Sequence, residues 1–319
     1  MIIGLKEKKE WKNKGYTIVR SALDNTLVKE CKKCIENKYN FNTPPQADFG
    51  SINGEFEFPS NTIFDNLTLN NNILNAVSYL LDTKDILLTQ SDAWSKMGMR
   101  DGCGDHSQSN RDQRIHMDYG NHSFLHVSDW DKPEVVAIII YLSDTELTGG
   151  GTAVVPKNSI TRDLYEMPYI NMPGQHKYLF NNDKKTAETY FLKNYPEVYK
   201  FRNKLYQNEI VVNAKPGDIL FYRLDLWHRG TPVKPNNIRH VVNLAFKKKE
   251  CYWINNWNKS FTKGMYYGKI ERLICSLTPR QCSVIGIPPV GDPIWNEERL
   301  KNIKARYPNF NIKPYLSKL

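Results

Sequence analysis

Two histidines and one aspartate have the types and spacing of a metal site. His116 and Asp118 lie in the segment RIHMDY, whose alternation predicts a strand. Side chains two residues apart on a strand point to the same face, so His116 and Asp118 would be presented together. His228, in the segment LWHRGT, supplies a third group. Two imidazoles and one carboxylate leave one face of an octahedral ion open, which is typical of non-haem iron(II) sites.

An arginine and an asparagine follow at spacings that place them near this set. Arg239 comes eleven residues after His228, on the apolar segment RHVVNLAF, and we expect it one hairpin strand away from the histidine. Its planar guanidinium suits a bidentate grip on a carboxylate. Asn243 lies four residues further and would face the same way. It either lines the same pocket or is a polar residue of the core.

Each of these residues also has an ordinary structural explanation. The two histidines can be core residues, Asp118 a turn carboxylate, and Arg239 a partner in a buried ion pair. An isolated H-x-D pattern occurs often by chance. The combination of all four residues on successive predicted strands favours the metal site over the separate structural explanations.

The surrounding pattern predicts a β-rich fold with helices at its ends. Val135 to Leu142 is a continuous apolar run, which indicates a strand buried on both faces. Gly149 to Gly151 precedes a strand rather than a helix, so it predicts a tight turn between strands and not a phosphate loop. Further strands are expected at 15–20, from 86, and at 152–156, 209–213, 219–222 and 239–246, with helices at about 26–36, 70–82 and 183–207. This order predicts a mainly β fold with flanking helices, a cupin-like jelly roll.

Composition describes a folded globular protein with an excess of basic residues. The 319 residues are 40% hydrophobic and 24% charged, with a formal net charge of +10. Such a charge can favour binding of an anionic partner, such as nucleic acid, a phosphorylated metabolite or a membrane surface. The basic residues are scattered apart from Lys6 to Lys9 and Lys247 to Lys249, which disfavours nucleic acid as a partner.

The six cysteines and the absence of long apolar segments predict a cytoplasmic protein with free thiols. Cys31 and Cys34 form a C-x-x-C pair in a predicted helix, but no second pair completes a zinc site. The sequence starts without the apolar core of a signal peptide. The longest apolar run is far too short to cross a bilayer, so no membrane partner is expected.

These patterns together resemble the phytanoyl-CoA dioxygenase family. The resemblance is carried by H-x-D, by the Gly-Asp that opens the strand at 217–222, by WHRGT and by the arginine eleven residues after the histidine. Three further stretches are similar: GYTIVRSALD at 15–24, GGGTAVVPKNS at 149–159, and the tail from LTPRQC at 277 to RYP at 306. The resemblance covers most of the chain, from about residue 15 to 315, and is weakest at 160–210.

The resemblance implies a double-stranded β-helix that binds Fe(II) and 2-oxoglutarate and uses O₂. Carried over, His116, Asp118 and His228 become the iron ligands, and Arg239 binds the distal carboxylate of 2-oxoglutarate. Thr231 is a candidate for a hydroxyl on that carboxylate, although the family commonly has Ser one position earlier. The implied reaction hydroxylates a C–H bond of a small-molecule substrate, with release of succinate and CO₂. Whether that substrate is anionic stays open. Halogenating relatives lack the carboxylate that Asp118 provides, so hydroxylation is the expected outcome, while desaturation and ring formation stay open.

The chain is expected to form a single domain over residues 1–319. Its parts are an N-terminal helical and loop part (1–112), a jelly-roll core (113–159 and 209–250), an insertion or lid (160–208) and a C-terminal extension (251–319). Two other hypotheses stay open. One is the same chemistry on nucleic acid or protein, and the other is a non-catalytic jelly roll that binds a ligand.

Overall fold

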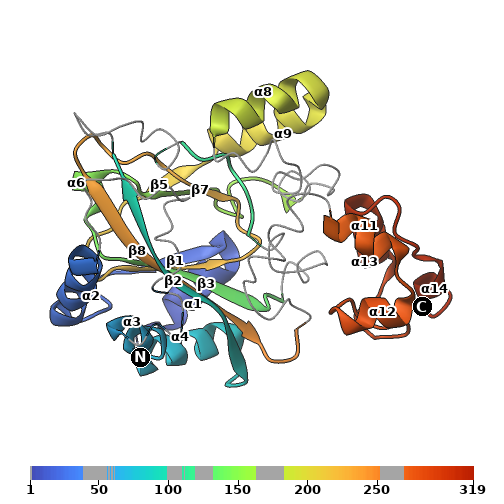
Figure 1. Cartoon of the computed structure of the whole chain (residues 1–319), viewed down its shortest axis with the longest axis horizontal. Helices are drawn as coiled ribbons and strands as arrows, with labels where there is room; N and C mark the ends of the chain where they lie inside the picture. Colours follow the sequence, from blue (N-terminus) through green and yellow to red (C-terminus); the bar gives the residue numbers. More distant parts are fainter. Residues whose placement is uncertain are drawn as a thin grey trace.

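The structure is a computed structural model that describes residues 2–38, 56, 58, 60, 62–98, 110, 112–118, 132–162, 183–251 and 269–319. Two antiparallel sheets form its centre, and helices pack outside them (Figure 1). The main sheet has the strand order β1 (Tyr16–Val19), β6 (Ile219–Arg223), β3 (Val135–Tyr141), β8 (Ile238–Lys248) and β2 (Ile86–Met97). The smaller sheet has the order β5 (Ile210–Val212), β4 (Thr152–Val154) and β7 (His228–Gly230). The predicted mainly β fold with flanking helices is confirmed.

The central strand β3 is buried on both faces, as its apolar run predicts. All seven of its residues are buried. Val136, Ile138 and Ile140 pack with the N-terminal helices in one core, whereas Ala137 and Tyr141 belong to a second core between the two sheets. The period-two alternation of a strand therefore divides the interior into a helix-facing side and an inter-sheet side.

Four helices cover the outer face of the main sheet (Figure 1). They are α1 (Leu5–Lys14), α2 (Asn25–Lys38), α3 (Ile63–Thr68) and α4 (Asn71–Leu81). The expected helices at about 26–36 and 70–82 are confirmed as α2 and α4. The helix α1 was not predicted, because its only buried residue is Trp11 and the rest of it is mainly Lys and Glu.

The connection from β3 to β4 differs from the expected tight turn between hairpin strands. A single helical turn, α6 (Thr145–Thr148), is capped by the Asp144 side chain. Gly149 and Gly150 follow with φ angles of 73° and 74°, in the left-handed region that glycine adopts without strain. The chain thereby passes from the main sheet into the smaller one, and β4 pairs with β5 and β7 instead of β3.

Two further groups of helices lie beyond the sheets. The helices α8 (Lys184–Asn194) and α9 (Pro196–Gln207) confirm the helical stretch expected at 183–207, and they lie side by side in Figure 1. The C-terminal helices α11 (Lys269–Ser276), α12 (Pro279–Val284), α13 (Glu297–Arg306) and α14 (Lys313–Leu316) pack around their own apolar core, which includes Trp295 and Tyr315. No helix in the described ranges is long and apolar enough to cross a membrane.

The cysteines of the described residues are free thiols, as expected. Cys31 is buried in α2, where burial raises the pKa of its thiol to about 12. Such a thiol stays protonated and unreactive at neutral pH. Cys34 is half-buried on the same helix, and Cys103 lies outside the described residues. The C-x-x-C pair therefore has the character of packing residues.

A buried charge cluster joins α1 to the turn that precedes β7. Asp225 accepts hydrogen bonds from Lys157 Nζ at 2.6 Å and from Arg223 Nε at 2.9 Å. All three side chains are less than a tenth exposed. The backbone N–H groups of Lys157 and Arg223 donate to the carbonyls of Lys14 and Gly15, each at 2.8 Å. The end of α1 and the chain just before His228 are therefore held by one network.

This cluster predicts an acid-sensitive contribution to stability. Burial by itself would raise the pKa of Asp225, but Lys157 and Arg223 hold it far below its usual range. A depressed pKa adds stability above the unfolded-state pKa of about 4, and this stability is lost by about 1.4 kcal/mol per pH unit below it. We expect Asp225→Asn to cost about 3–5 kcal/mol at pH 7, because two buried cations lose their counter-charge. Urea unfolding measures the difference in unfolding free energy between the wild type and Asp225→Asn, and this difference should become smaller below pH 4. A difference that stays constant from pH 7 to pH 3 would contradict the account.

Candidate metal centre

The structure brings the three predicted ligand residues together. His116 Nε2 lies 3.5 Å from Asp118 Oδ1, and His228 Nε2 lies 3.3 Å from Asp118 Oδ2. The two imidazole centroids are 4.5 Å apart. One ligand atom from each residue falls within 4.8 Å of the others, and this is the one such cluster of three or more metal-capable side chains among the described residues. The arrangement is compact enough for a single ion to contact all three.

The segment that carries His116 and Asp118 is not the regular strand that its alternation predicts. His116 and His228 exchange both backbone hydrogen bonds at 2.9 Å, but this pair is an isolated bridge. In a regular antiparallel ladder, the next hydrogen-bonded pair before His116 and His228 would be Arg114 and Gly230. Here Gln113 N–H donates to the Gly230 carbonyl in place of Arg114 N–H. Gly230 N–H donates to the Gln113 side chain instead of a backbone carbonyl. One extra residue therefore interrupts the ladder, as in a β-bulge.

This irregularity helps to orient the His116 ring. Gly230 N–H donates to the Gln113 side chain, and the Arg114 carbonyl contacts His116 Nδ1 at 3.0 Å. His228 Nδ1 makes the same kind of contact with the Leu226 carbonyl at 2.9 Å. A carbonyl can only accept, so in each ring the proton resides on Nδ1 and the lone pair on Nε2. A backbone carbonyl on the second ring nitrogen is the usual support of a metal-binding histidine.

The electrostatics of the cluster favour an ionised carboxylate beside an uncharged imidazole. Burial, together with the neighbouring His228, lowers the pKa of His116 to about 4. Burial would raise the pKa of Asp118, but the two histidines hold it well below its usual range. Burial would lower the pKa of His228, yet Asp118 raises it. Metal binding needs deprotonated ligands, so His116 and Asp118 are already in the required state at neutral pH.

Tyr222 is a site residue that the sequence analysis missed. Its hydroxyl donates to Asp118 Oδ2 at 2.8 Å, and its ring centroid lies 5.0 Å from that of His228. The residue was placed correctly in a strand, now β6, and alternation along β6 turns residues 220 and 222 towards the inter-sheet core. The alternation of the strand could have indicated that Tyr222 faces inward, but no sequence pattern indicated that Asp118 would lie opposite it.

Arg239 lies in the interior on β8, opposite Lys96 of β2. Only 7% of the residue is exposed, and burial lowers the pKa of its guanidinium to about 10. Its Nε atom is buried without a hydrogen-bond partner among the described residues. A Cβ added to Gly150 would lie 3.4 Å from this Nε, so the glycine leaves space beside the guanidinium. The expectation that Arg239 is one hairpin strand from His228 is wrong, because β7 and β8 belong to different sheets.

Thr231 and Asn243 have less direct relations to the cluster. Thr231 Oγ1 donates to the Gly151 carbonyl at 2.8 Å, so its hydroxyl proton is already used. Asn243 is half-buried on β8, four residues from Arg239 and thus on the same face, and it pairs with Asp92 and Ile139 on the adjacent strands. Their roles in binding a co-substrate stay predictions.

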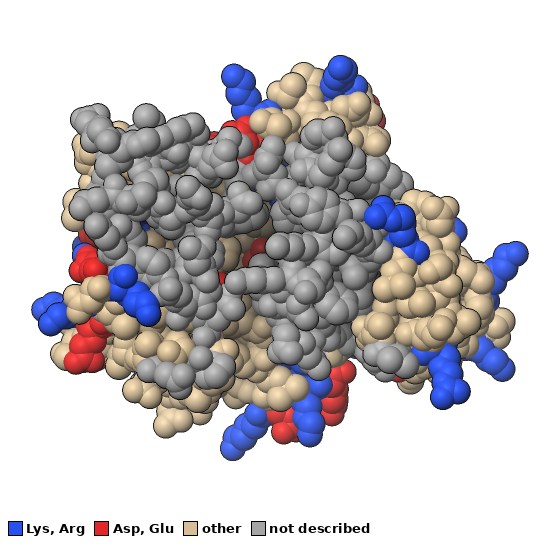
Figure 2. All heavy atoms as spheres, in the orientation of Figure 1, with Lys and Arg blue, Asp and Glu red and all other residues tan. Residues whose placement is uncertain are grey.

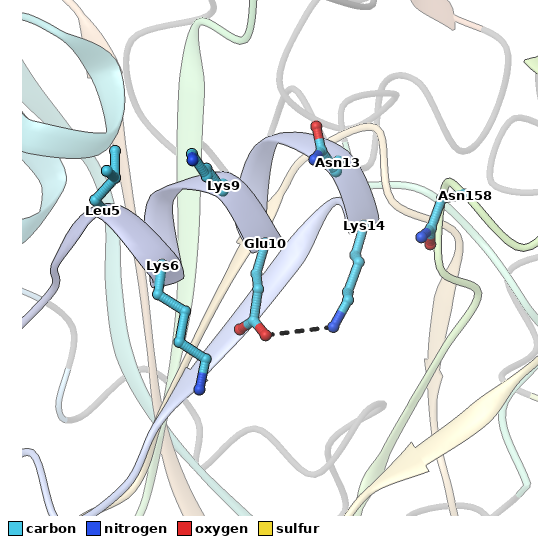
Figure 3. Close-up of a pocket in the computed structure, with 7 residues that line it drawn as sticks. All are labelled: Leu5, Lys6, Lys9, Glu10, Asn13, Lys14 and Asn158. Carbon is cyan, nitrogen blue, oxygen red and sulfur yellow. Dashed lines mark hydrogen bonds and ion pairs between the residues drawn. The ribbon is translucent and has the colours of Figure 1, made fainter.

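A shallow recess beside α1 lies apart from these residues. It is lined by Leu5, Lys6, Lys9, Glu10, Asn13, Lys14 and Asn158 (Figure 3). Lys14 pairs with Glu10 at 3.3 Å, and no residue of the metal cluster contributes to the lining. The recess has the character of a solvated helix face.

Comparison with solved structures shows the fold of the chain. EvdO2 from Micromonospora carbonacea var. aurantiaca is 11% identical, with a TM-score of 0.53 over 77% of this chain and 91% of EvdO2. SnoK, a non-heme alpha-ketoglutarate-dependent carbocyclase from nogalamycin biosynthesis, is 13% identical, with a TM-score of 0.53 over 90% of this chain and 93% of SnoK. The epimerase SnoN, solved with Fe3+, alpha ketoglutarate and nogalamycin RO, is 12% identical, with a TM-score of 0.51 over 79% of this chain and 85% of SnoN.

The curated proteins gave no match. The sequence profile described as Phytanoyl-CoA dioxygenase (PhyH) matches residues 11–241, a range that contains the three clustered ligands, Thr231 and Arg239. Because this match covers well over half of the sequence, the chain belongs to the phytanoyl-CoA dioxygenase family of Fe(II)- and 2-oxoglutarate-dependent oxygenases.

Proposed function

We propose that His116, Asp118 and His228 hold one Fe(II) ion and that the chain uses it, with 2-oxoglutarate and O₂, to hydroxylate a C–H bond of a small molecule. The observation that carries the proposal is the convergence of three ligand atoms within 4.8 Å from two segments of the inter-sheet core. Two imidazoles and one carboxylate bind one side of an octahedral ion, which leaves positions for a co-substrate and O₂.

The side chains around the three ligands fit a bound cation. Both Nε2 lone pairs are directed inward because both Nδ1–H groups are held by carbonyls. The Tyr222 hydroxyl occupies one lone pair of Asp118 Oδ2 and leaves others available. A tyrosine hydroxyl fixes the carboxylate without adding charge, so Asp118 keeps its full attraction for a metal ion.

Arg239 fits the distal carboxylate of 2-oxoglutarate. No carboxylate among the described residues pairs with Arg239, so burying its guanidinium is costly, and an anion that binds there offsets this cost. The orphaned Nε and the space beside Gly150 are features that a bound carboxylate would use. We propose Arg239 as the principal group and Asn243 as a pocket residue. Because the Thr231 hydroxyl donates to Gly151 O, it would have to rotate before it could donate to a carboxylate.

The bound iron and 2-oxoglutarate would supply oxidation of a substrate C–H bond at the expense of O₂, with release of succinate and CO₂. The chain's own residues would then bind and orient the ion and the co-substrate. His116, Asp118 and His228 fix the ion, Arg239 fixes the far end of the co-substrate, and the apolar inter-sheet core, which includes Val241 and Leu220, keeps water from the reacting centre.

Removal of a C–H hydrogen without oxygen transfer is the second candidate. The observation that favours it is that the structurally similar SnoK is a carbocyclase and SnoN an epimerase. Both are also described in relation to nogalamycin, which supports a small molecule as the substrate class. Labelled O₂ separates the two candidates, because hydroxylation places the label in the product and cyclisation or epimerisation does not.

The basic net charge gives weaker support for a nucleic-acid substrate. In the view of Figure 2, Lys and Arg side chains lie singly or in small groups around the periphery, with acidic side chains beside several of them. A nucleic-acid footprint is a continuous basic patch. The described residues on this face show no such patch, so the formal charge of +10 remains the one feature that favours nucleic acid.

Removing a ligand imidazole tests the metal assignment. We expect His228→Ala to abolish stoichiometric Fe(II) binding, because two remaining ligands cannot hold the ion on one side of the site. Anaerobic calorimetric titration of metal-free protein measures this. His240→Asn is the matched control, since it removes a buried imidazole that bonds Ser95 on the helix-facing side of β8. Unchanged Fe(II) binding by His228→Ala would exclude it from the ligand set.

Replacing Arg239 by an apolar residue of similar length tests the co-substrate assignment. We expect Arg239→Met to weaken 2-oxoglutarate binding by about 2–5 kcal/mol, because the carboxylate would be left unpaired in the interior. Fe(II) binding should be retained. The thermal midpoint of the metal-free variant should equal or exceed that of the wild type, since the substitution removes a buried charge that has no carboxylate partner among the described residues. Arg20→Gln, at an exposed arginine, is the control. Unaltered 2-oxoglutarate affinity in Arg239→Met would contradict the assignment.

A further inference from the structure

Ile115, the residue before the ligand His116, is held by side chains instead of by a neighbouring strand. Its backbone N–H donates to the Tyr206 hydroxyl at 2.9 Å. Its carbonyl accepts a hydrogen bond from Arg202 Nη2 at 3.0 Å. Tyr206 and Arg202 are four residues apart on α9, so they lie on one face of the helix. Side chains of a single helix thus bond both the N–H and the carbonyl of Ile115.

Glu188 of α8 completes this network. Its carboxylate accepts hydrogen bonds from the Tyr206 hydroxyl at 2.8 Å and from Arg202 Nη2 at 2.6 Å, and Arg202 Nε contacts both of its oxygens at 2.9 and 3.1 Å. The Arg202 side chain is 1% exposed and that of Glu188 13%. Because the Tyr206 proton points to Glu188, the phenol oxygen turns its lone pairs to the Ile115 N–H. The carboxylate therefore sets the direction of both contacts to Ile115.

The network lies where a strand would otherwise be needed. Along an extended chain, the backbone groups of successive residues point to opposite sides. Those of His116 point to His228, so those of Ile115 point away from β7. On this outer edge, Tyr206 and Arg202 take the positions of the missing partner. Without them, the Ile115 backbone would lose both of these hydrogen bonds, and the segment would depend on the bridge of His116 to His228 and on the contacts of Gln113 with Gly230.

The helix α9 also reaches the segment that carries the other histidine. The ring of Phe201 packs edge-on against Trp227, with centroids 5.9 Å apart. Trp227 is buried and directly precedes His228. One helix therefore contacts the residue before each of the two histidine ligands.

We propose that Tyr206 and Arg202, aligned by Glu188, are positioning residues that set His116 for metal binding. The proposal rests on the proposed iron site. It assigns the α8–α9 pair a fixed role in the metal centre, acting through the Ile115 backbone. Loss of a residue that supports a metal ligand typically weakens metal affinity or activity by about 10–100-fold.

The test uses variants that remove one contact and preserve packing. Tyr206→Phe keeps the ring but deprives the Ile115 N–H of its acceptor. Tyr199→Phe is the matched control on the same helix, because the Tyr199 hydroxyl has no hydrogen-bond partner among the described residues. Glu188→Gln is a second variant, which keeps the shape of the side chain and removes its charge. The measurements are amide hydrogen exchange at Ile115 in metal-free protein, the thermal midpoint, and the affinity and visible spectrum of bound Co(II).

For Tyr206→Phe we expect exchange at Ile115 to be about fivefold to tenfold faster, as for the loss of one hydrogen bond. Co(II) should bind about tenfold more weakly with an altered spectrum, while the thermal midpoint stays close to that of Tyr199→Phe. Glu188→Gln should likewise speed up amide exchange at Ile115 and alter the spectrum of bound Co(II).

Two results would overturn the proposal. The first is an unchanged Co(II) affinity and spectrum in Tyr206→Phe and Glu188→Gln, which would leave the network a purely structural contact. The second is unchanged exchange at Ile115. If wild-type protein binds no metal, the proposed iron site fails separately, and the role in positioning His116 for a metal is overturned with it, whatever the exchange result.

Discussion

The backbone bridge between His116 and His228 is the constraint on which the site depends. These residues are far apart in the sequence, yet two hydrogen bonds of 2.9 Å fix them opposite each other. Asp118 then lies between the two imidazoles, within 3.5 Å of each Nε2. The strand β4 pairs with one edge of β7. The bridge to His116 uses the other edge of β7. The order of the smaller sheet thus decides where the ligands meet, and the main sheet provides the apolar wall behind them.

Each half of the bridge has its own buried ionic support. On the His228 side, Asp225 joins Lys157 and Arg223 and ties the turn before β7 to the end of α1. On the His116 side, Glu188 joins Arg202 and Tyr206. Buried ion pairs add little net stability compared with apolar packing, but they are specific in geometry. Arg239 differs from these residues, since no carboxylate among the described residues pairs with its guanidinium.

Part of this arrangement could be predicted from local sequence. The apolar run of β3 and the periodicity of α4 depend on nearest-neighbour patterns, and both are confirmed. The three clustered ligands were found because His116 and Asp118 share a short motif and His228 follows a recognisable turn. Tyr222, Arg202 and Glu188 were missed because each acts on a residue distant in sequence. The bulge before His116 was missed for the same reason, since the Gln113 side chain that replaces a backbone acceptor has no local signal. The helix α1 has one apolar anchor, too few to produce a periodic pattern.

Joint binding of one iron ion and 2-oxoglutarate at His116, Asp118 and His228 is the proposal that an experiment can test most directly. Metal-free protein would be titrated without oxygen, first with Fe(II) and then with 2-oxoglutarate, while the visible absorption spectrum is recorded. The account predicts a weak charge-transfer band that appears only when both are present and is absent in Asp118→Ala. Wild-type protein that takes up Fe(II) and 2-oxoglutarate without developing this band, or that shows the same band in Asp118→Ala, would contradict the claim.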